Sequence, residues 1–208
     1  MEYVFKPRNI PVITRWIAEE IVKTHDLGLK EAYLTLDLGL TTEKVELLDE
    51  EVLIRNFRLN MKKIREIVKK NDAVYLVDKN GVRRISFFSN GSYYKLKAIS
   101  GNTAPTLEIN GIHMHRIKEV TPWEDSQMKV LALGILKGDR VLDICTGLGY
   151  TAIISLKYGA SRVTTIEKDL NVLRIAELTP WSRKLANEKI QLILGDAFKI
   201  LKKFKDES

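Results

Sequence analysis

Residues 141–149 read Val-Leu-Asp-Ile-Cys-Thr-Gly-Leu-Gly, and this stretch decides the expected fold. Apolar residues within 141–144 predict a short strand, and Gly147 and Gly149 predict a tight turn at its end. The apolar run that begins at Tyr150 predicts a helix directly after the turn. Glycine permits positive φ and close approach of a ligand, and the first N–H groups of a helix are free to bind one. The stretch therefore predicts a turn that holds a nucleotide cofactor.

Two kinds of cofactor compete for this turn. Gly147–Ala152 fits the dinucleotide pattern G-x-G-x-x-G/A, and Glu167 lies about 20 residues beyond it, as that pattern requires. Asp143, however, stands within the strand, where its negative charge would repel the phosphates of NAD. A carboxylate at this position suits a ligand that carries an ammonium or sulfonium charge, so an NAD-dependent dehydrogenase is the least favoured interpretation.

The segment resembles motif I of class I S-adenosylmethionine-dependent methyltransferases, whose usual form is acid-x-Gly-x-Gly-x-Gly. Cys145 stands where that form has its first glycine. Two further strand-like runs follow: Arg162–Ile166 is followed by Glu167, and Ile190–Leu194 is followed by Gly195-Asp196-Ala197. Together with Thr-Pro-Trp-Glu-Asp at 121–125 and Pro-Trp-Ser-Arg at 180–183, these motifs also resemble uncharacterised archaeal predicted methyltransferases.

The resemblance implies a role for each acid. Asp143 and the glycine turn would hold the methionine end of S-adenosylmethionine, Glu167 would accept hydrogen bonds from the ribose hydroxyls, and Asp196 would lie beside the adenine amino group. All three acids follow the same rule, because ligands of open α/β sheets bind at the carboxyl ends of the strands. The candidate cofactor-binding residues are Asp143, Cys145, Thr146, Gly147, Leu148, Gly149, Glu167, Lys168, Asp196 and Ala197.

Each acid also has a purely structural explanation. Asp143 could cap the following helix, Glu167 could favour the dipole of its helix, and Asp196 could be an N-cap, a position that Asp prefers. Three such coincidences at three successive strand ends are less expected than one shared cofactor site.

The expected fold class is α/β: a Rossmann-like class I methyltransferase sheet, apparently truncated after strand three, preceded by a smaller α+β domain. Residues 1–120 form the expected accessory domain and residues 121–208 the N-terminal half of the cofactor domain. Thr121-Pro122-Trp123-Glu124 marks the boundary as a capping box with Pro at the first helical position. In the family, the region after strand three carries the acceptor-binding motif. No catalytic residue is therefore predicted within this sequence. If catalysis requires that region, the chain is expected to be an inactive fragment.

Within residues 1–120, the pattern predicts helices over Pro11–Thr24 and Leu59–Lys70. Strands are expected at Ala32–Leu38, Lys44–Leu48, Val52–Ile54, Val74–Val77, Val82–Phe88, Tyr93–Ile99, Leu107–Ile109 and Ile112–Ile117. Three Asn-Gly pairs, at 80–81, 90–91 and 110–111, predict hairpin turns. Farther along, Pro180 is expected to interrupt a helix and begin another.

Composition limits the class of protein. The chain has 208 residues, 45% of them hydrophobic, with a formal net charge of +7 and one cysteine. No apolar stretch is long enough for a membrane span, and the first residues do not form a signal peptide. A cytoplasmic location without a membrane partner is expected, because a single cysteine suits a reducing compartment. Abundant Lys, Glu and Ile with two Gln residues is typical of hyperthermophile proteins.

Several functions remain open on the sequence alone. The methyl acceptor is unknown, with RNA and a small amine as candidates. An aminopropyltransferase of the spermidine-synthase type is the second enzyme hypothesis, and a non-catalytic nucleic-acid-binding module is the third. Basic runs at Lys62–Lys70 and at the tail (Lys199, Lys202, Lys203, Lys205) suit nucleic acid or a solvated helix face equally. His113 and His115 lack the partners of a zinc site, so no metal is expected. Oligomerisation is left open.

Overall fold

The structure is a computed structural model that describes residues 1–202, and it divides into two compact units. Unit 1 comprises Met1–Arg8 together with the chain from Trp123 onward, and unit 2 comprises Asn9–Pro122. The sequence placed residues 1–120 in one domain, whereas the first eight residues belong to the same unit as the chain from Trp123 onward. The reason is strand-type pairing: the Tyr3 N–H donates to the Leu192 carbonyl and the Leu194 N–H to the Met1 carbonyl, each at 2.8 Å.

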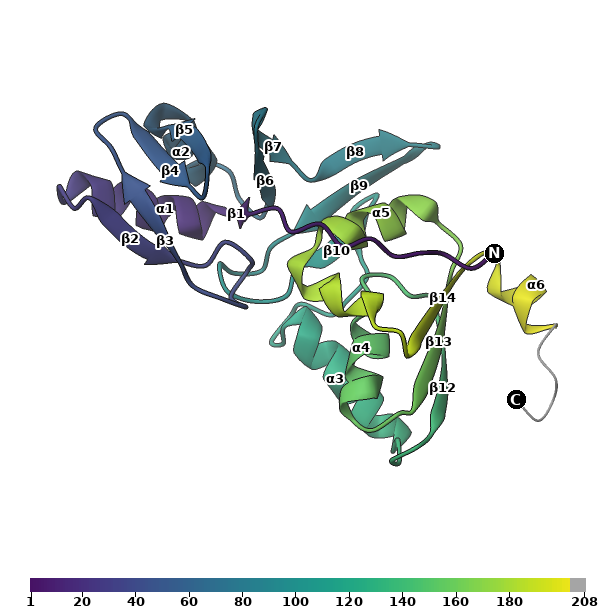
Figure 1. Ribbon diagram of the computed structural model, residues 1–208. Coiled ribbons are helices and arrows are strands. Elements are labelled where there is room, and N and C mark those ends of the chain that lie inside the picture. Colours follow the sequence, from purple (N-terminus) through teal and green to yellow (C-terminus); the bar gives the residue numbers. More distant parts are fainter. Residues whose placement is uncertain (203–208) are drawn as a thin grey trace. The chain divides into compact units, whose positions relative to one another are not determined.

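Unit 1 is built on a parallel three-stranded sheet in the order β12-β13-β14. The strands are β12 (Arg140–Ile144), β13 (Arg162–Glu167) and β14 (Ile190–Leu194). The helices are α3 (Pro122–Leu133), α4 (Tyr150–Lys157), α5 (Leu170–Leu178), the 3₁₀ helix η1 (Pro180–Ala186) and α6 (Ala197–Leu201). Figure 1 shows α3, α4 and α5 on the same side of the sheet. The expected alternation of strand and helix in a mixed α/β unit is therefore confirmed.

The break at Pro180 shapes the part of unit 1 behind the glycine turn. Helix α5 ends at Leu178, and Pro180 begins η1, because proline cannot donate the hydrogen bond that would continue α5. The two Thr-Pro-Trp triplets of the sequence meet here: the rings of Trp123 and Trp181 lie 5.1 Å apart, and Trp123 lies 5.6 Å from the ring of Tyr150. The start of α3, the start of α4 and η1 thus share one aromatic cluster.

Strand β12 has an open edge. Within residues 1–202 it pairs with β13 alone, whereas β14 is bordered on its outer side by an antiparallel bridge between Ile193 and Glu2. Leu142 and Ile144 on β12 are 43% and 47% exposed. Strands of parallel sheets are normally covered on both faces, so this exposure is unusual for the class.

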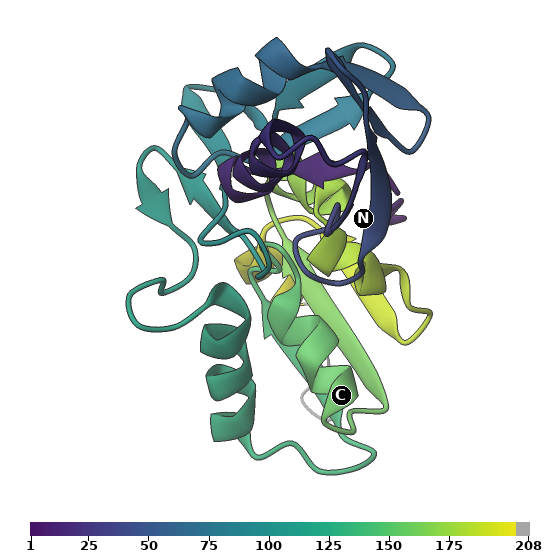
Figure 2. The ribbon, with the colours of Figure 1, turned by 90° about the vertical axis from the view of Figure 1, so that its left-hand side faces the viewer.

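Unit 2 contains three antiparallel sheets in the orders β1-β6-β7, β2-β3-β4-β5 and β11-β10-β9-β8. Helices α1 (Arg15–Asp26) and α2 (Met61–Val68) pack together and share an apolar core with the second sheet (Figure 2). The strands are β1 (Val12–Ile13), β2 (Glu31–Leu34), β3 (Glu43–Leu47), β4 (Glu51–Ile54), β5 (Phe57–Asn60), β6 (Tyr75–Asp78), β7 (Gly81–Arg84), β8 (Ser86–Ser89), β9 (Ser92–Lys97), β10 (Thr106–Ile109) and β11 (Ile112–His113).

Several expected elements of unit 2 differ from the structure. Pro11 does not start α1, because Val12–Ile13 pair with β6 and the helix begins only at Arg15. The strand expected over Val82–Phe88 is two strands that belong to different sheets, β7 and β8. Strand β5 was not predicted, and the strand expected over Ile112–Ile117 ends already at His113.

Two of the three Asn-Gly pairs form the expected turns. Asn90-Gly91 and Asn110-Gly111 have positive φ at both residues, which a type I′ hairpin requires. Gly81 instead lies opposite Asp78 in the ladder, so the residues that link β6 to β7 are 79–80. Within residues 1–202, no helix combines the length and apolar character needed to cross a bilayer.

Candidate cofactor site

The glycine turn after β12 is fixed to the neighbouring strand by its own backbone. The N–H groups of Cys145 and Thr146 both donate to the Ile166 carbonyl on β13, at 2.9 and 3.0 Å. The Gly149 N–H then donates to the Thr146 carbonyl at 2.7 Å and closes the turn. The backbone therefore holds residues 145–149 at the carboxyl end of the sheet without help from a ligand.

The turn is also packed from behind by η1. The Ser182 hydroxyl donates to the Leu148 carbonyl at 2.7 Å, and both side chains are fully buried. Because the Leu148 side chain is 0% exposed, this candidate residue can offer a ligand only its backbone. Gly149, the N-cap of α4, has φ of 76°, and a Cβ there would lie 2.3 Å from Leu185.

Cys145 adopts a left-handed backbone conformation, which glycine reaches without strain. Its φ is 68°, which an L-residue reaches only with strain, and its side chain is exposed. The cysteine at this position of the turn therefore has a cost in stability that glycine would avoid.

We expect the substitution Cys145→Gly to stabilise the protein by about 0.5–1 kcal/mol, because the relief of left-handed strain exceeds the greater chain entropy of unfolded glycine. Chemical denaturation of the two proteins measures this difference. A loss of stability would instead show that the cysteine side chain contributes packing that outweighs its backbone strain.

Asp143 lies beneath the turn, between β13 and α4. Its Oδ1 accepts a hydrogen bond from the Thr151 hydroxyl at 2.9 Å and its Oδ2 one from the Thr165 hydroxyl at 2.7 Å. Burial raises the pKa of the Asp143 carboxyl above its ordinary value, the two hydroxyls oppose this rise, and the charge of Glu167 adds to it. Each Asp143 oxygen thus accepts from a side-chain hydroxyl, so these contacts are those of a side-chain clamp rather than of an N-cap.

Glu167 connects all three strand ends. Its Oε2 accepts from the Gly147 N–H at 3.0 Å, and its Oε1 accepts from the N–H groups of Lys168 and Asp169 at 2.9 and 3.0 Å. Its carbonyl accepts from the Gly195 N–H at 2.8 Å. A carboxylate has about four acceptor positions, so one position on Oε2 is left for a ligand hydroxyl.

Asp196 and Ala197 begin α6 at the end of β14. Asp196 is exposed and is the N-cap of α6, where its side chain accepts a 3.4 Å hydrogen bond from the Lys199 N–H. The cap uses one carboxylate oxygen and leaves the other oxygen for a ligand. The exposed Lys168 contributes its backbone N–H to Glu167, as above. Lys203 and Lys205 of the basic tail lie outside the described residues.

The sequence analysis missed Thr151 and Thr165. Both are directed at Asp143, and Thr165 is 0% exposed. The sequence signal that could have found Thr165 is its spacing, two positions before the strand-end acid Glu167, because alternate residues of a strand share one face.

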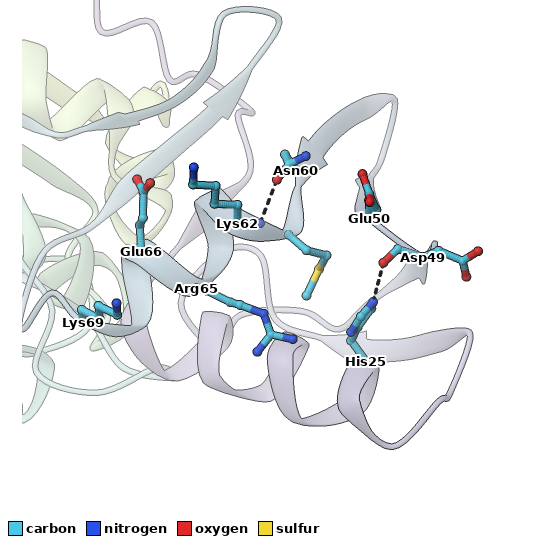
Figure 3. Close-up of a pocket in the computed structure, with 9 residues that line it drawn as sticks. His25, Asp49, Glu50, Asn60, Lys62, Arg65, Glu66 and Lys69 are labelled. Carbon is cyan, nitrogen blue, oxygen red and sulfur yellow. Dashed lines mark hydrogen bonds between the residues drawn. The ribbon is translucent and has the colours of Figure 1, made fainter.

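A pocket of about 710 Å³ lies in unit 2, away from these residues in the chain (Figure 3). It is lined by nine residues from α1, from the turn before β4 and from α2 with its flanks: His25, Asp49, Glu50, Asn60, Met61, Lys62, Arg65, Glu66 and Lys69. The His25 ring contacts the Asp49 carbonyl, and Asn60 caps α2 by accepting from the Lys62 N–H. Its lining mixes three acidic with three basic side chains, so its charge selects no class of ligand.

The other histidines take part in unit 2 contacts. His113 Nε2 lies 3.0 Å from a Glu108 carboxylate oxygen and 3.2 Å from the Lys97 ammonium, and His115 Nδ1 lies 3.0 Å from the Thr106 hydroxyl. Over residues 1–202, no group of three or more His, Cys, Asp or Glu side chains is placed to hold a metal ion.

Comparison with known sequences finds an archaeal relative. An uncharacterized protein of Methanocaldococcus jannaschii is 42% identical to the chain over 199 residues, which make up 94% of the chain. The chain spans 66% of that relative's length. No family model matches the sequence.

Similar solved structures include transferases of two kinds. Spermidine synthase from Thermotoga maritima is 20% identical, with a TM-score of 0.48 over 58% of this chain and 43% of that one. A SAM-dependent O-methyltransferase from the same organism is 16% identical, with a TM-score of 0.34 over 76% of this chain and 53% of that one. Both TM-scores are too low to establish a common fold.

Proposed function

We propose that unit 1 is the cofactor-binding part of an S-adenosylmethionine-dependent methyltransferase. One observation carries this proposal: a positive-φ turn at 145–149 lies between a clamped Asp143 and a Glu167 that bonds to the Gly147 N–H. The arrangement offers negative charge toward the turn and a hydroxyl acceptor beside it, which suits a cationic nucleoside better than a pyrophosphate. We also propose that the enzyme acts in the cytoplasm and that its methyl acceptor is a nucleic acid or a small amine.

The residues present fit such a cofactor. Bound S-adenosylmethionine would supply an electrophilic methyl group. Glu167 would orient the ribose through its remaining Oε2 position, Asp196 would lie near the adenine, and the turn with Asp143 would hold the methionine end. The contribution of the protein is chiefly alignment of donor and acceptor.

We also propose that the sheet of unit 1 continues in a longer form of the protein. The open edge of β12, its exposed Leu142 and Ile144, and the greater length of the archaeal relative support this idea. Residues of the additional part would supply the acceptor site, which is why no catalytic base is assigned among residues 1–202.

A calorimetric titration of the purified chain tests the proposal. S-adenosylmethionine and S-adenosylhomocysteine are expected to bind, and NAD is not, because its phosphates would face Asp143. A preference for decarboxylated S-adenosylmethionine would instead support an aminopropyltransferase. If neither this chain nor one lengthened to the span of the relative binds any of these nucleosides, the proposal is wrong.

The substitution Asp143→Asn separates binding from folding. We expect it to weaken S-adenosylmethionine binding at least tenfold, because the ligand cation loses its counter-charge. Stability is expected to stay the same or to rise at neutral pH. Folding raises the pKa of Asp143 above its unfolded value of about 3.8. The free energy of unfolding of the wild type therefore falls as the pH rises from about 3.8 through the folded-state pKa. Asparagine does not titrate, so the variant lacks this loss. Denaturation at pH 4 and pH 7 measures it.

A further inference from the structure

Three threonine hydroxyls and Asp143 form one continuous chain of hydrogen bonds under the glycine turn. The Thr146 and Thr165 hydroxyl oxygens lie 2.7 Å apart, the Thr165 hydroxyl donates to Asp143 Oδ2, and the Thr151 hydroxyl donates to Asp143 Oδ1. Thr146 and Thr165 are 3% and 0% exposed, so water does not compete for these bonds. The chain thus joins the turn, two strands and α4.

The direction of the hydrogen bonds follows from counting protons. A hydroxyl has one proton, and the Thr165 hydroxyl donates its proton to Asp143 Oδ2. The Thr146 hydroxyl must therefore be the donor in its bond to Thr165. Each bond polarises the next, so the carboxylate is coupled to a residue of the turn itself.

We propose that Thr165 is a positioning residue, which together with Thr146 orients the Asp143 carboxylate and couples it to the conformation of the glycine turn. The consequence for a ligand at this turn rests on the function proposed above. A cationic ligand would meet a carboxylate whose orientation is already fixed, and which does not have to be ordered when the ligand binds.

The charged surroundings of Asp143 are simple enough to test this role by titration. Glu167 on β13 acts on Asp143 electrostatically, and α4 contributes the neutral Thr151 hydroxyl. The charged residues Arg140 and Arg162 lie at the opposite, amino ends of β12 and β13. A change in the pKa of Asp143 after substitution of Thr165 therefore reports the lost hydroxyl.

The experiment follows the ¹³C signal of the Asp143 carboxyl by NMR through a pH titration of the wild type, Thr165→Val and Thr165→Ser. Valine keeps the shape of threonine, so the pKa of Asp143 is expected to rise by about 1 to 2 in Thr165→Val, the equivalent of one hydrogen bond to a charged group. Serine keeps the hydroxyl and is expected to restore the wild-type value. Thr146→Val is expected to shift the pKa in the same direction but less.

Titration with S-adenosylhomocysteine and S-adenosylmethionine supplies the second measurement. Thr165→Val is expected to bind S-adenosylmethionine about tenfold more weakly at pH 7.5, with a larger deficit at pH 5.5, and Thr165→Ser is expected to bind normally. An unchanged Asp143 pKa in both valine variants would overturn the inference. So would equal binding by wild type and Thr165→Val at both pH values. A wild type that binds no nucleoside but shows the pKa changes would refute the proposed function and leave the positioning role of Thr165 standing.

Discussion

Gly149→Ala is expected to destabilise the protein by about 2 to 5 kcal/mol. A left-handed φ of 76° costs an L-residue about 1 to 2 kcal/mol, and the new Cβ would lie 2.3–2.5 Å from three carbons of Leu185. Leu185 is 2% exposed and packs among buried neighbours, so it cannot move aside without cost. Thermal or chemical denaturation measures the change.

Gly134→Ala is the matched control for this prediction. Gly134 also lies in unit 1 with a positive φ, of 63°, but nothing lies within 4 Å of its added Cβ. Its loss is expected to be about 1 to 2 kcal/mol, from the backbone alone. Equal losses at both glycines would contradict the close packing of η1 against the turn. The double variant Gly149→Ala with Leu185→Ala provides a further test. A loss of unfolding free energy smaller than the sum of the two single losses would support the close packing.

Glu167→Gln is expected to abolish the recognition of a ribose hydroxyl. The wild type should bind S-adenosylhomocysteine about tenfold to a hundredfold more tightly than its 2′-deoxy analogue, because a hydroxyl donates to the charged Oε2. The Glu167→Gln variant should bind both ligands weakly, with dissociation constants that differ by no more than about threefold. Calorimetry on the two ligands and two proteins completes the cycle.

The same substitution is expected to lower stability. Three backbone N–H groups donate to the Glu167 carboxylate, and an amide offers one acceptor oxygen in place of two. Glu188→Gln is the control, since Glu188 is an exposed acid that precedes β14 at the opposite end of the sheet. If Glu167→Gln still discriminates against the deoxy ligand as strongly as the wild type, Glu167 does not bind the ribose. Its role would then be limited to its hydrogen bonds with the loop backbone.

The sequence predicts the local parts of unit 1 well, for physical reasons. Residues 141–144, 162–166 and 190–194 are short strand-like runs. They lead into the Gly147–Gly149 turn, Glu167 and Gly195-Asp196, and these signals need no knowledge of distant contacts. The break at Pro180 is equally local, since it depends on the missing N–H of proline.

Contacts between distant residues could not be predicted in the same way. The bond from Thr165 to Asp143 depends on the register of β13 beside β12, which places those two residues opposite each other. The division of Val82–Phe88 into two strands depends on which sheet each half joins. The hydrophobic periodicity of a strand indicates which face is buried, but it does not identify the strand that pairs with it.

The pairing of Met1–Tyr3 with β14 has a consequence for biosynthesis. The amine of Met1 donates to the carbonyl of Leu194, 193 residues later in the chain, so this segment is synthesised well before the strand that it borders. The compact unit Asn9–Pro122 can fold before β14 is synthesised, because domains generally fold as units during synthesis. An amino-terminal affinity tag would therefore extend a segment that docks late, and the yield of folded protein is best compared with tags at each end.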